Sequence, residues 1–108
     1  MLFRSYVRMR YPLQYEAFVR AHADNYGIDP SLLAAVIYTE SKFDPNARSA
    51  AGAVGLMQLM PDTAQRYGVG NRRDPEANLA GGTEYLKDLL GMFDNDLTLA
   101  LEIGRAHV

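Results

Sequence analysis

The sequence predicts a single all-α domain, and three observations support this fold class. Apolar residues recur at helical spacing in several separate stretches, no alternating pattern is long enough to specify a strand, and glycine and proline residues mark the ends of the stretches. The chain has 108 residues, with 48% hydrophobic and 22% charged side chains, which is enough for one hydrophobic core. This composition is typical of an ordered globular protein.

Capping residues set the bounds of the first two helices. A helix is expected from Leu13 to Tyr26, because Gly27 can end it. A second helix begins at Pro30, with Asp29 as its capping carboxylate. The residues at helical spacing in the first helix are Ala17, Phe18, Ala21 and Asn25.

Proline residues open the next two helices. The third is short, beginning at Pro61 and ending at Gly68. The fourth starts at Asp74-Pro75 and contains Gly81-Gly82, where each glycine costs ~1 kcal/mol relative to alanine and is tolerated for the close approach of another backbone. A fifth helix is expected from Leu97. The apolar stripe of the fourth helix consists of Leu79, Leu86, Leu89, Leu90 and Phe93.

One acidic residue continues the apolar stripe of the second helix. Leu33, Val36, Ile37 and then Glu40 follow the spacing of a single helical face, so Glu40 is expected to point toward the interior or a cleft wall. A helix C-terminus and partial burial both disfavour a negative charge. The position therefore suits a group that must donate a proton near neutral pH.

Composition excludes several kinds of site. The formal net charge is −2, so no overall basic field favours nucleic acid. The chain has no cysteine, which excludes disulfides, thiolate nucleophiles and sulfur-ligated metals. The two histidines, His22 and His107, lie far apart in the sequence, so we expect no metal site. Cofactors are not expected either.

A family resemblance extends over about fifty residues from Ile28 and continues downstream. The pattern resembles the soluble lytic transglycosylase (SLT) type of catalytic domain, found in lysozyme-like enzymes that cut bacterial peptidoglycan. Many identities at fixed spacing make the pattern specific. It consists of Glu40-Ser41, Pro45, Ala47, Ser49, Gly52-Ala53, Gly55-Leu56-Met57-Gln58, Met60-Pro61 and Thr63-Ala64, extended by Asn78, Gly82, Tyr85 and Leu86.

The resemblance implies a lysozyme-like (goose-type/SLT) helical fold and a definite activity. Members cleave the bond between N-acetylmuramic acid (MurNAc) and N-acetylglucosamine (GlcNAc) and leave a 1,6-anhydromuramoyl end. By this resemblance, Glu40 is the sole catalytic acid/base, and Ser49, Gln58 and Met60 bind substrate. Glycoside cleavage usually needs two carboxylates. One suffices if the C6 hydroxyl of the substrate attacks the anomeric carbon, because Glu40 can then act first as acid and later as base.

Other interpretations of individual residues remain open. Gln58 either satisfies buried backbone groups or faces the cleft. Met57 is expected in the core, and Asp44, which precedes Pro45, is expected to form a turn rather than act as a second carboxylate. Ser41 and Ser49 have no histidine at a suitable spacing, so a serine nucleophile is not expected. The tyrosines Tyr38, Tyr67 and Tyr85 are expected in the core or at its rim.

Three other functions compete with lytic transglycosylation. A muramidase would hydrolyse the same bond with water and would need a second carboxylate across the cleft. A non-catalytic peptidoglycan-binding module would keep the fold without turnover. A helical nucleic-acid-binding domain is opposed by the acidic charge balance.

The chain ends depart from the family pattern. We expect residues 13–101 to be the transglycosylase domain, incomplete at its C-terminus, and residues 102–108 to be a non-native tail, since they resemble a translated sequencing-library adapter. Residues 1–12 are expected to be a leader or connector, which could follow a missing export or anchor segment. A chain truncated in this way is expected to be weakly active.

The family also implies the setting in which the domain acts. The expected partner is the peptidoglycan glycan strand, with no nucleic acid, and a membrane is contacted only through such an anchor. We expect a monomer in the cell envelope, outside the cytoplasm, although no signal peptide is evident.

Overall fold

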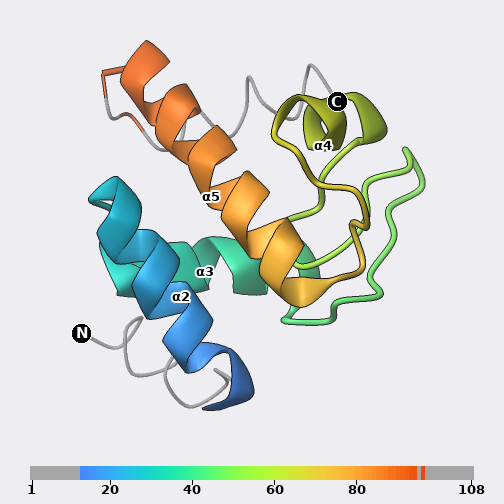
Figure 1. Ribbon diagram of the computed structural model, residues 1–108, viewed down its shortest axis with the longest axis horizontal. Helices are drawn as coiled ribbons and strands as arrows, with labels where there is room; N and C mark the ends of the chain where they lie inside the picture. The colour runs from blue at the N-terminus through green and yellow to red at the C-terminus, as the bar shows by residue number, and fades with distance from the viewer. Residues whose placement is uncertain (1–12, 95, 97–108) are drawn as a thin grey trace.

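The computed structural model describes residues 13–94 and 96. These residues form four helices and no strand, apart from two isolated β-bridges. Helix α5 packs against both α2 and α4, while α2 packs against α3 (Figure 1). The all-α prediction is confirmed. The helices are α2 (Leu13–Tyr26), α3 (Pro30–Ser41), α4 (Pro61–Arg66) and α5 (Pro75–Met92).

Local signals position α3 as predicted. The Asp29 carboxylate accepts a hydrogen bond of 2.8 Å from the Ser31 backbone nitrogen, and Pro30 occupies the first turn. At the other end, Lys42 and Phe43 both have left-handed backbone conformations, with φ of 53° and 62°. The buried Phe43 ring stacks on Tyr15 of α2, with 6.1 Å between ring centroids. Burial of this ring stabilises a turn that ends α3 sharply beside α2.

The buried face of α2 differs from the predicted one. Tyr15, Val19 and Ala23 are buried at i, i+4 and i+8, whereas Phe18 is only half-buried. Tyr15 and Val19 bury more apolar area than alanine would at these positions, and the small Ala23 completes the buried face; the alanines on the opposite face are good helix formers that need no burial. The predicted residues that are exposed are Ala17, Ala21 and Asn25.

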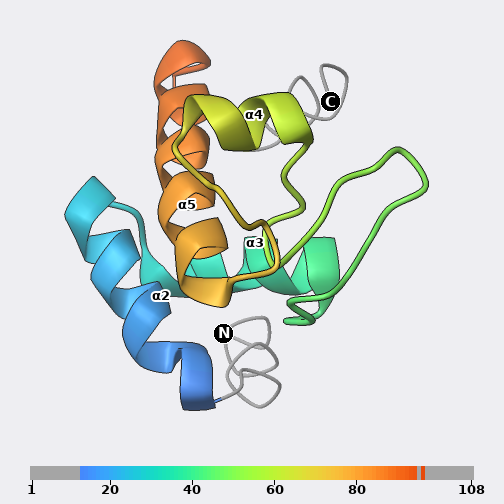
Figure 2. The same ribbon diagram turned by 45° about the vertical axis from the view of Figure 1, so that its right-hand side comes forward.

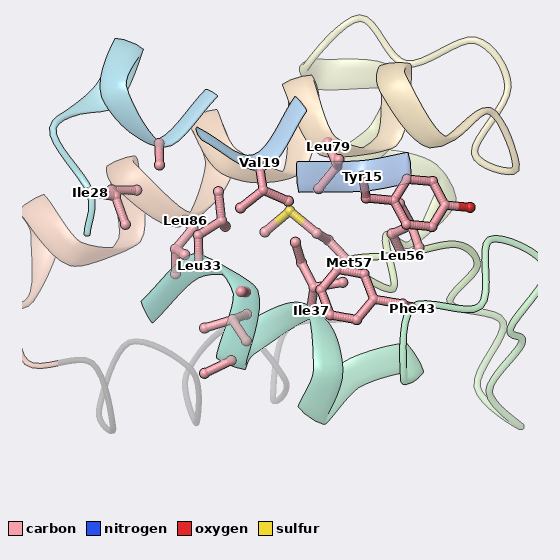
Figure 3. Packing of buried hydrophobic residues seen from close by; sticks show 14 of the residues in the cluster. Tyr15, Val19, Ile28, Leu33, Ile37, Phe43, Leu56, Met57, Leu79 and Leu86 are labelled. Carbon is pink, nitrogen blue, oxygen red and sulfur yellow. The ribbon is translucent and has the colours of Figure 1, made fainter. Parts of the chain in front are cut away.

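The core joins the helices to the segment between α3 and α4. Leu56 and Met57 of this segment belong to the same buried cluster as residues of α2, α3 and α5. Figure 3 shows the Met57 side chain reaching into the core near Val19 and Ile37. The expected core role of Met57 is therefore confirmed. Because the segment contributes core side chains, its backbone is fixed relative to the helices.

The two glycines inside α5 allow close packing, though against side chains rather than another backbone. A Cβ atom added to Gly81 would lie 2.3 Å from Cγ2 of Val69. One added to Gly82 would lie 2.6 Å from Sδ and 2.9 Å from Cβ of Met57. The expected stripe of α5 is also confirmed, since Leu79, Leu86, Leu89 and Leu90 are buried and Phe93 is partly buried.

Replacing Gly82 with alanine is expected to lower the free energy of unfolding by ~1–3 kcal/mol, because a new methyl group overpacks the core. A different Met57 rotamer cannot relieve the contact, since its own Cβ is involved. Gly91, in the same helix, is exposed and has no atom within 4 Å of an added Cβ. Gly91→Ala is expected to be neutral or stabilising by up to ~1 kcal/mol. Urea unfolding measures the stability of both variants. Equal free energies of unfolding for Gly82→Ala and Gly91→Ala would contradict the close contact between Gly82 and Met57.

Several expectations fall on residues outside the described part of the chain. These are the fifth helix from Leu97, the leader over residues 1–12 and the tail over residues 102–108. Within the described residues, no helix combines the length and the apolar character required to cross a membrane.

Candidate active site

Glu40 lies in the last turn of α3, at the edge of the core. Leu33, Val36 and Ile37 on the same stripe are buried, whereas Glu40 is half-buried. The apolar stripe of α3 is therefore buried up to Ile37 and reaches the protein surface at Glu40. A half-buried carboxyl group in such a place can meet a ligand.

The residue next to Glu40 ties α3 to the segment that follows. The buried Ser41 hydroxyl lies 2.8 Å from the Leu56 carbonyl oxygen and 3.1 Å from that of Ile37. A hydroxyl has one proton, so it donates to one of these carbonyls at a time. The shorter contact fixes the end of α3, and with it the Glu40 backbone, against a residue fifteen positions away.

Residues 42–60, which we call the motif loop, join α3 to α4, and part of this segment extends away from the helices (Figure 2). Antiparallel bridges pair Val54 with Arg48 and with Leu59. Val54 and Leu59 exchange backbone hydrogen bonds of 3.0 and 3.1 Å. The Gly55 nitrogen donates to the Ala47 carbonyl at 3.0 Å. The loop is thus an ordered structure of closely paired backbone without a full strand.

The three predicted substrate-binding residues all lie on the motif loop. Ser49 is exposed, and its Oγ accepts a hydrogen bond of 3.0 Å from the Ala53 nitrogen. Met60 is half-buried and directly precedes α4. Contact of these side chains with a glycan stays a prediction.

Gln58 performs one of the two roles considered for it. Its Nε2 donates to the carbonyl oxygens of Ala47 and Gly55, at 3.0 and 2.9 Å, and its own φ is 53°. The side-chain amide of Gln58 therefore satisfies two backbone carbonyls and links two parts of the motif loop to each other. A contact of Gln58 with substrate remains a prediction that would add to this structural role.

Asn78 of α5 holds the motif loop from the core side. It is fully buried, and its Oδ1 accepts from the Met57 nitrogen at 2.8 Å. Its Nδ2 donates to the carbonyl oxygens of Val54 and Arg72, at 3.1 and 2.9 Å. Asn78 belongs to the family pattern, but no role for it was predicted from the sequence. The signal was a polar residue four positions before Gly82, on the inner face of the helix.

Arg72 was not singled out from the sequence. Its Nη1 donates to the carbonyl oxygens of Gly52 and Leu59, both at 2.8 Å. A cavity of about 200 Å³ lies beside it, and its lining residues are Val54, Gly70, Asn71, Arg72 and Arg73.

Only glycine fits at position 55. Its φ is 93°, and an added Cβ would lie 2.2 Å from both the Arg72 carbonyl oxygen and Nδ2 of Asn78. The glycine in the family pattern thus has a physical reason, because its missing side chain lets residues 72 and 78 reach the loop.

Two other predicted roles are structural. The Asp44 carboxylate accepts a hydrogen bond of 2.9 Å from the Asn46 nitrogen, which forms the expected turn. The half-buried Tyr67 donates to Asp88 at 2.6 Å, and its ring centroid is 5.5 Å from that of Tyr85. Burial, followed by the bond to Asp88, raises the pKa of Tyr67 to about 12. Tyr67 is therefore a neutral rim residue at physiological pH.

Among residues 13–94 and 96, no three His, Cys, Asp or Glu side chains gather in a way that could hold a metal ion.

Comparisons with known proteins show the family. Residues 17–102 match the model of the Transglycosylase SLT domain family, and the chain belongs to that family. It is 43% identical over 89 residues to a transglycosylase of Enterobacteria phage PRD1, a match covering 82% of this chain and 33% of the phage protein. It is 41% identical over 95 residues to membrane-bound lytic murein transglycosylase F 1 of Alkalilimnicola ehrlichii, covering 88% of this chain and 19% of that protein.

Solved structures agree with this assignment. The lytic transglycosylase Slt of Pseudomonas aeruginosa, solved as an inactive mutant, has a TM-score of 0.74 at 32% identity, covering 83% of this chain and 16% of Slt. The 70 kDa soluble lytic transglycosylase of Escherichia coli has a TM-score of 0.70 at 31% identity, covering 82% of this chain and 16% of that enzyme. The chain thus spans a third or less of the length of each of these relatives.

Proposed function

We propose that this chain is the catalytic domain of a peptidoglycan lytic transglycosylase. The observation that carries the proposal is the position of Glu40, half-buried at the end of α3, beside a serine that binds the motif loop. Family membership and the lytic murein transglycosylases among the relatives support the same activity.

The reaction needs one proton donor and no activated water. The Glu40 carboxylic acid donates its proton to the oxygen of the MurNAc–GlcNAc bond, and the bond from the anomeric carbon to that oxygen breaks. The C6 hydroxyl oxygen of the same MurNAc residue bonds to the anomeric carbon and closes the 1,6-anhydro ring. The Glu40 carboxylate accepts the hydroxyl proton, which restores the acid for the next cycle.

The motif loop supplies substrate contacts in this proposal. Ser49, Gln58 and Met60 bind the glycan strand, and their positions follow from the pairing of the loop with itself and with α5. The Pseudomonas aeruginosa neighbour was solved as an inactive mutant with glutamine in place of one glutamate. Its inactivity supports a mechanism that depends on a single glutamate.

We place this activity in the cell envelope, outside the cytoplasm. Murein is the substrate named for several relatives, and some of them are described as membrane-bound. The domain is proposed to act on glycan strands as a monomer.

Digestion of purified peptidoglycan tests the proposed reaction. The expected products are muropeptides with 1,6-anhydromuramoyl ends, each lighter by one water than the product of a hydrolytic muramidase run beside it. Mass spectrometry distinguishes the two. Reducing ends from this protein would instead establish a muramidase, and binding to peptidoglycan without any product would establish a non-catalytic module.

A further inference from the structure

We propose that Arg72 is a positioning residue for glycan binding, because its guanidinium group holds the motif loop in its binding shape. This inference rests on the proposed function, in which that loop carries the substrate contacts. Arg72 itself lies outside the loop and outside the family pattern described above. Its Nη1 carries two hydrogens and donates one to each of two loop carbonyls, Gly52 and Leu59, at 2.8 Å.

The two carbonyls belong to different limbs of the motif loop. Gly52 lies in the turn before Val54, and Leu59 is the residue that pairs with Val54 on the other side. A single charged donor therefore joins both limbs across the pairing. Hydrogen bonds from a charged donor are stronger than those between neutral groups.

The motif loop needs such support, because its own pairing is short. Two isolated bridges connect Arg48, Val54 and Leu59. A short pair of strands is marginally stable on its own in water. The Asn78 side chain holds the inner side of the loop through Val54 and Met57, and Arg72 holds the limbs.

Arg72 is itself anchored to a helix. Its carbonyl oxygen accepts a hydrogen bond of 2.9 Å from Asn78 of α5 and packs where Gly55 has no side chain. The connection therefore runs from α5 through Asn78 to the Arg72 backbone, and from the Arg72 side chain to the loop. This path gives the loop a fixed position relative to the core.

The effect is expected on substrate binding more than on the chemical step. Glu40 lies on α3 and is fixed through Ser41, not through Arg72. A loosened loop must be ordered when the glycan binds, and this ordering weakens affinity. If the substrate and the transition state lose the same amount of binding free energy, KM rises and kcat stays unchanged.

Three variants of the full chain test the proposal. Arg72→Met keeps an unbranched apolar stem but removes the guanidinium group and both hydrogen bonds, and Arg72→Lys restores a charged donor. Arg73→Met is the matched control: Arg73 is exposed, and its side chain forms no hydrogen bond or ion pair within residues 13–94 and 96. Affinity for a MurNAc–GlcNAc tetrasaccharide is measured by calorimetry in a Glu40→Gln background, where turnover does not interfere.

Arg72→Met is expected to weaken tetrasaccharide binding and to raise KM on the order of tenfold, with kcat within about threefold. Arg72→Lys should recover part of the affinity, and Arg73→Met should bind as the parent does. Amide hydrogen exchange at Val54 and Leu59 should quicken in Arg72→Met but not in Arg73→Met. A merely destabilising role would lower the thermal midpoint and leave the affinity of the folded protein unchanged.

Unchanged affinity in folded Arg72→Met, or an equal fall in Arg73→Met, would overturn the proposal. If no variant binds or cleaves glycan, the proposed function fails, and the exchange measurement still decides whether Arg72 orders the loop. Equal exchange at Val54 and Leu59 in the Arg72 and Arg73 variants would then exclude that role. If Arg72→Met does not fold, Arg72→Lys is compared with Arg73→Lys in the same way.

Discussion

Replacing Asn78 with alanine is expected to destabilise the domain more than any other single change considered above. The substitution leaves the buried Met57 nitrogen and the part-buried Arg72 carbonyl without their side-chain partner, and the Val54 carbonyl keeps only its bond from the Leu59 nitrogen. An unsatisfied buried polar group costs ~1–3 kcal/mol, so the loss of partners at two groups is expected to lower the free energy of unfolding by roughly 2–6 kcal/mol. Small domains are stable by only ~5–15 kcal/mol, so much of the population would unfold on modest heating.

The control for this prediction is another asparagine nearby. Asn71 is exposed, and its Oδ1 accepts from the Arg73 nitrogen at 3.0 Å, within the same turn. Asn71→Ala is expected to change the free energy of unfolding by about 1 kcal/mol or less. Denaturant unfolding followed by circular dichroism measures both variants. Similar midpoints would show that the buried asparagine does not support the motif loop as described.

The largest effect on activity is expected for Glu40→Gln. Glutamine keeps nearly the same volume but can neither donate a proton to the glycosidic oxygen nor accept one from the C6 hydroxyl. Positioned acid–base groups contribute about 100-fold to 10,000-fold to rate, so a fall in kcat of at least about 100-fold is expected. Glycan affinity should stay close to that of the parent, because the amide keeps the volume and the polar atoms that contact the substrate.

The matched control for Glu40→Gln is Glu76→Gln. Glu76 is an exposed glutamate in the first turn of α5, outside the site. Its substitution changes the charge by the same amount and should leave turnover within about twofold. An equal loss in both variants would mean that net charge, not a positioned carboxyl group, controls the rate.

Local signals in the sequence predicted most of the helical framework. Asp29-Pro30 and Asp74-Pro75 begin α3 and α5 at the expected residues, because such signals act on neighbouring residues only, although the Asp29 side chain forms a capping hydrogen bond and the Asp74 side chain does not. The stripe from Leu33 to Ile37 correctly placed Glu40 at the edge of the core. The face of α2 was predicted wrongly, because spacing alone did not show that Tyr15 and Val19 fill the core better than alanines do.

The contacts that shape the site could not be predicted in the same way. Arg72 and Asn78 act on loop residues 13 to 24 positions away, and no periodic pattern marks such pairs. A polar residue in a helix is usually exposed, so the sequence did not indicate that Asn78 is buried or that its side chain binds three backbone groups. The two hydrogen bonds from the Gln58 side chain, to the carbonyls of Ala47 and Gly55, likewise depend on a left-handed backbone conformation at Gln58 that the sequence did not indicate.

The central claim is that one carboxyl group serves as both acid and base and that the substrate supplies its own nucleophile. The most direct test is digestion of peptidoglycan in water labelled with heavy oxygen, by the parent protein and by Glu40→Gln, with products analysed by mass spectrometry. The parent should release anhydro products without label, and Glu40→Gln should release almost none. Label in the products of the parent, or anhydro products formed at the parental rate by Glu40→Gln, would contradict the claim.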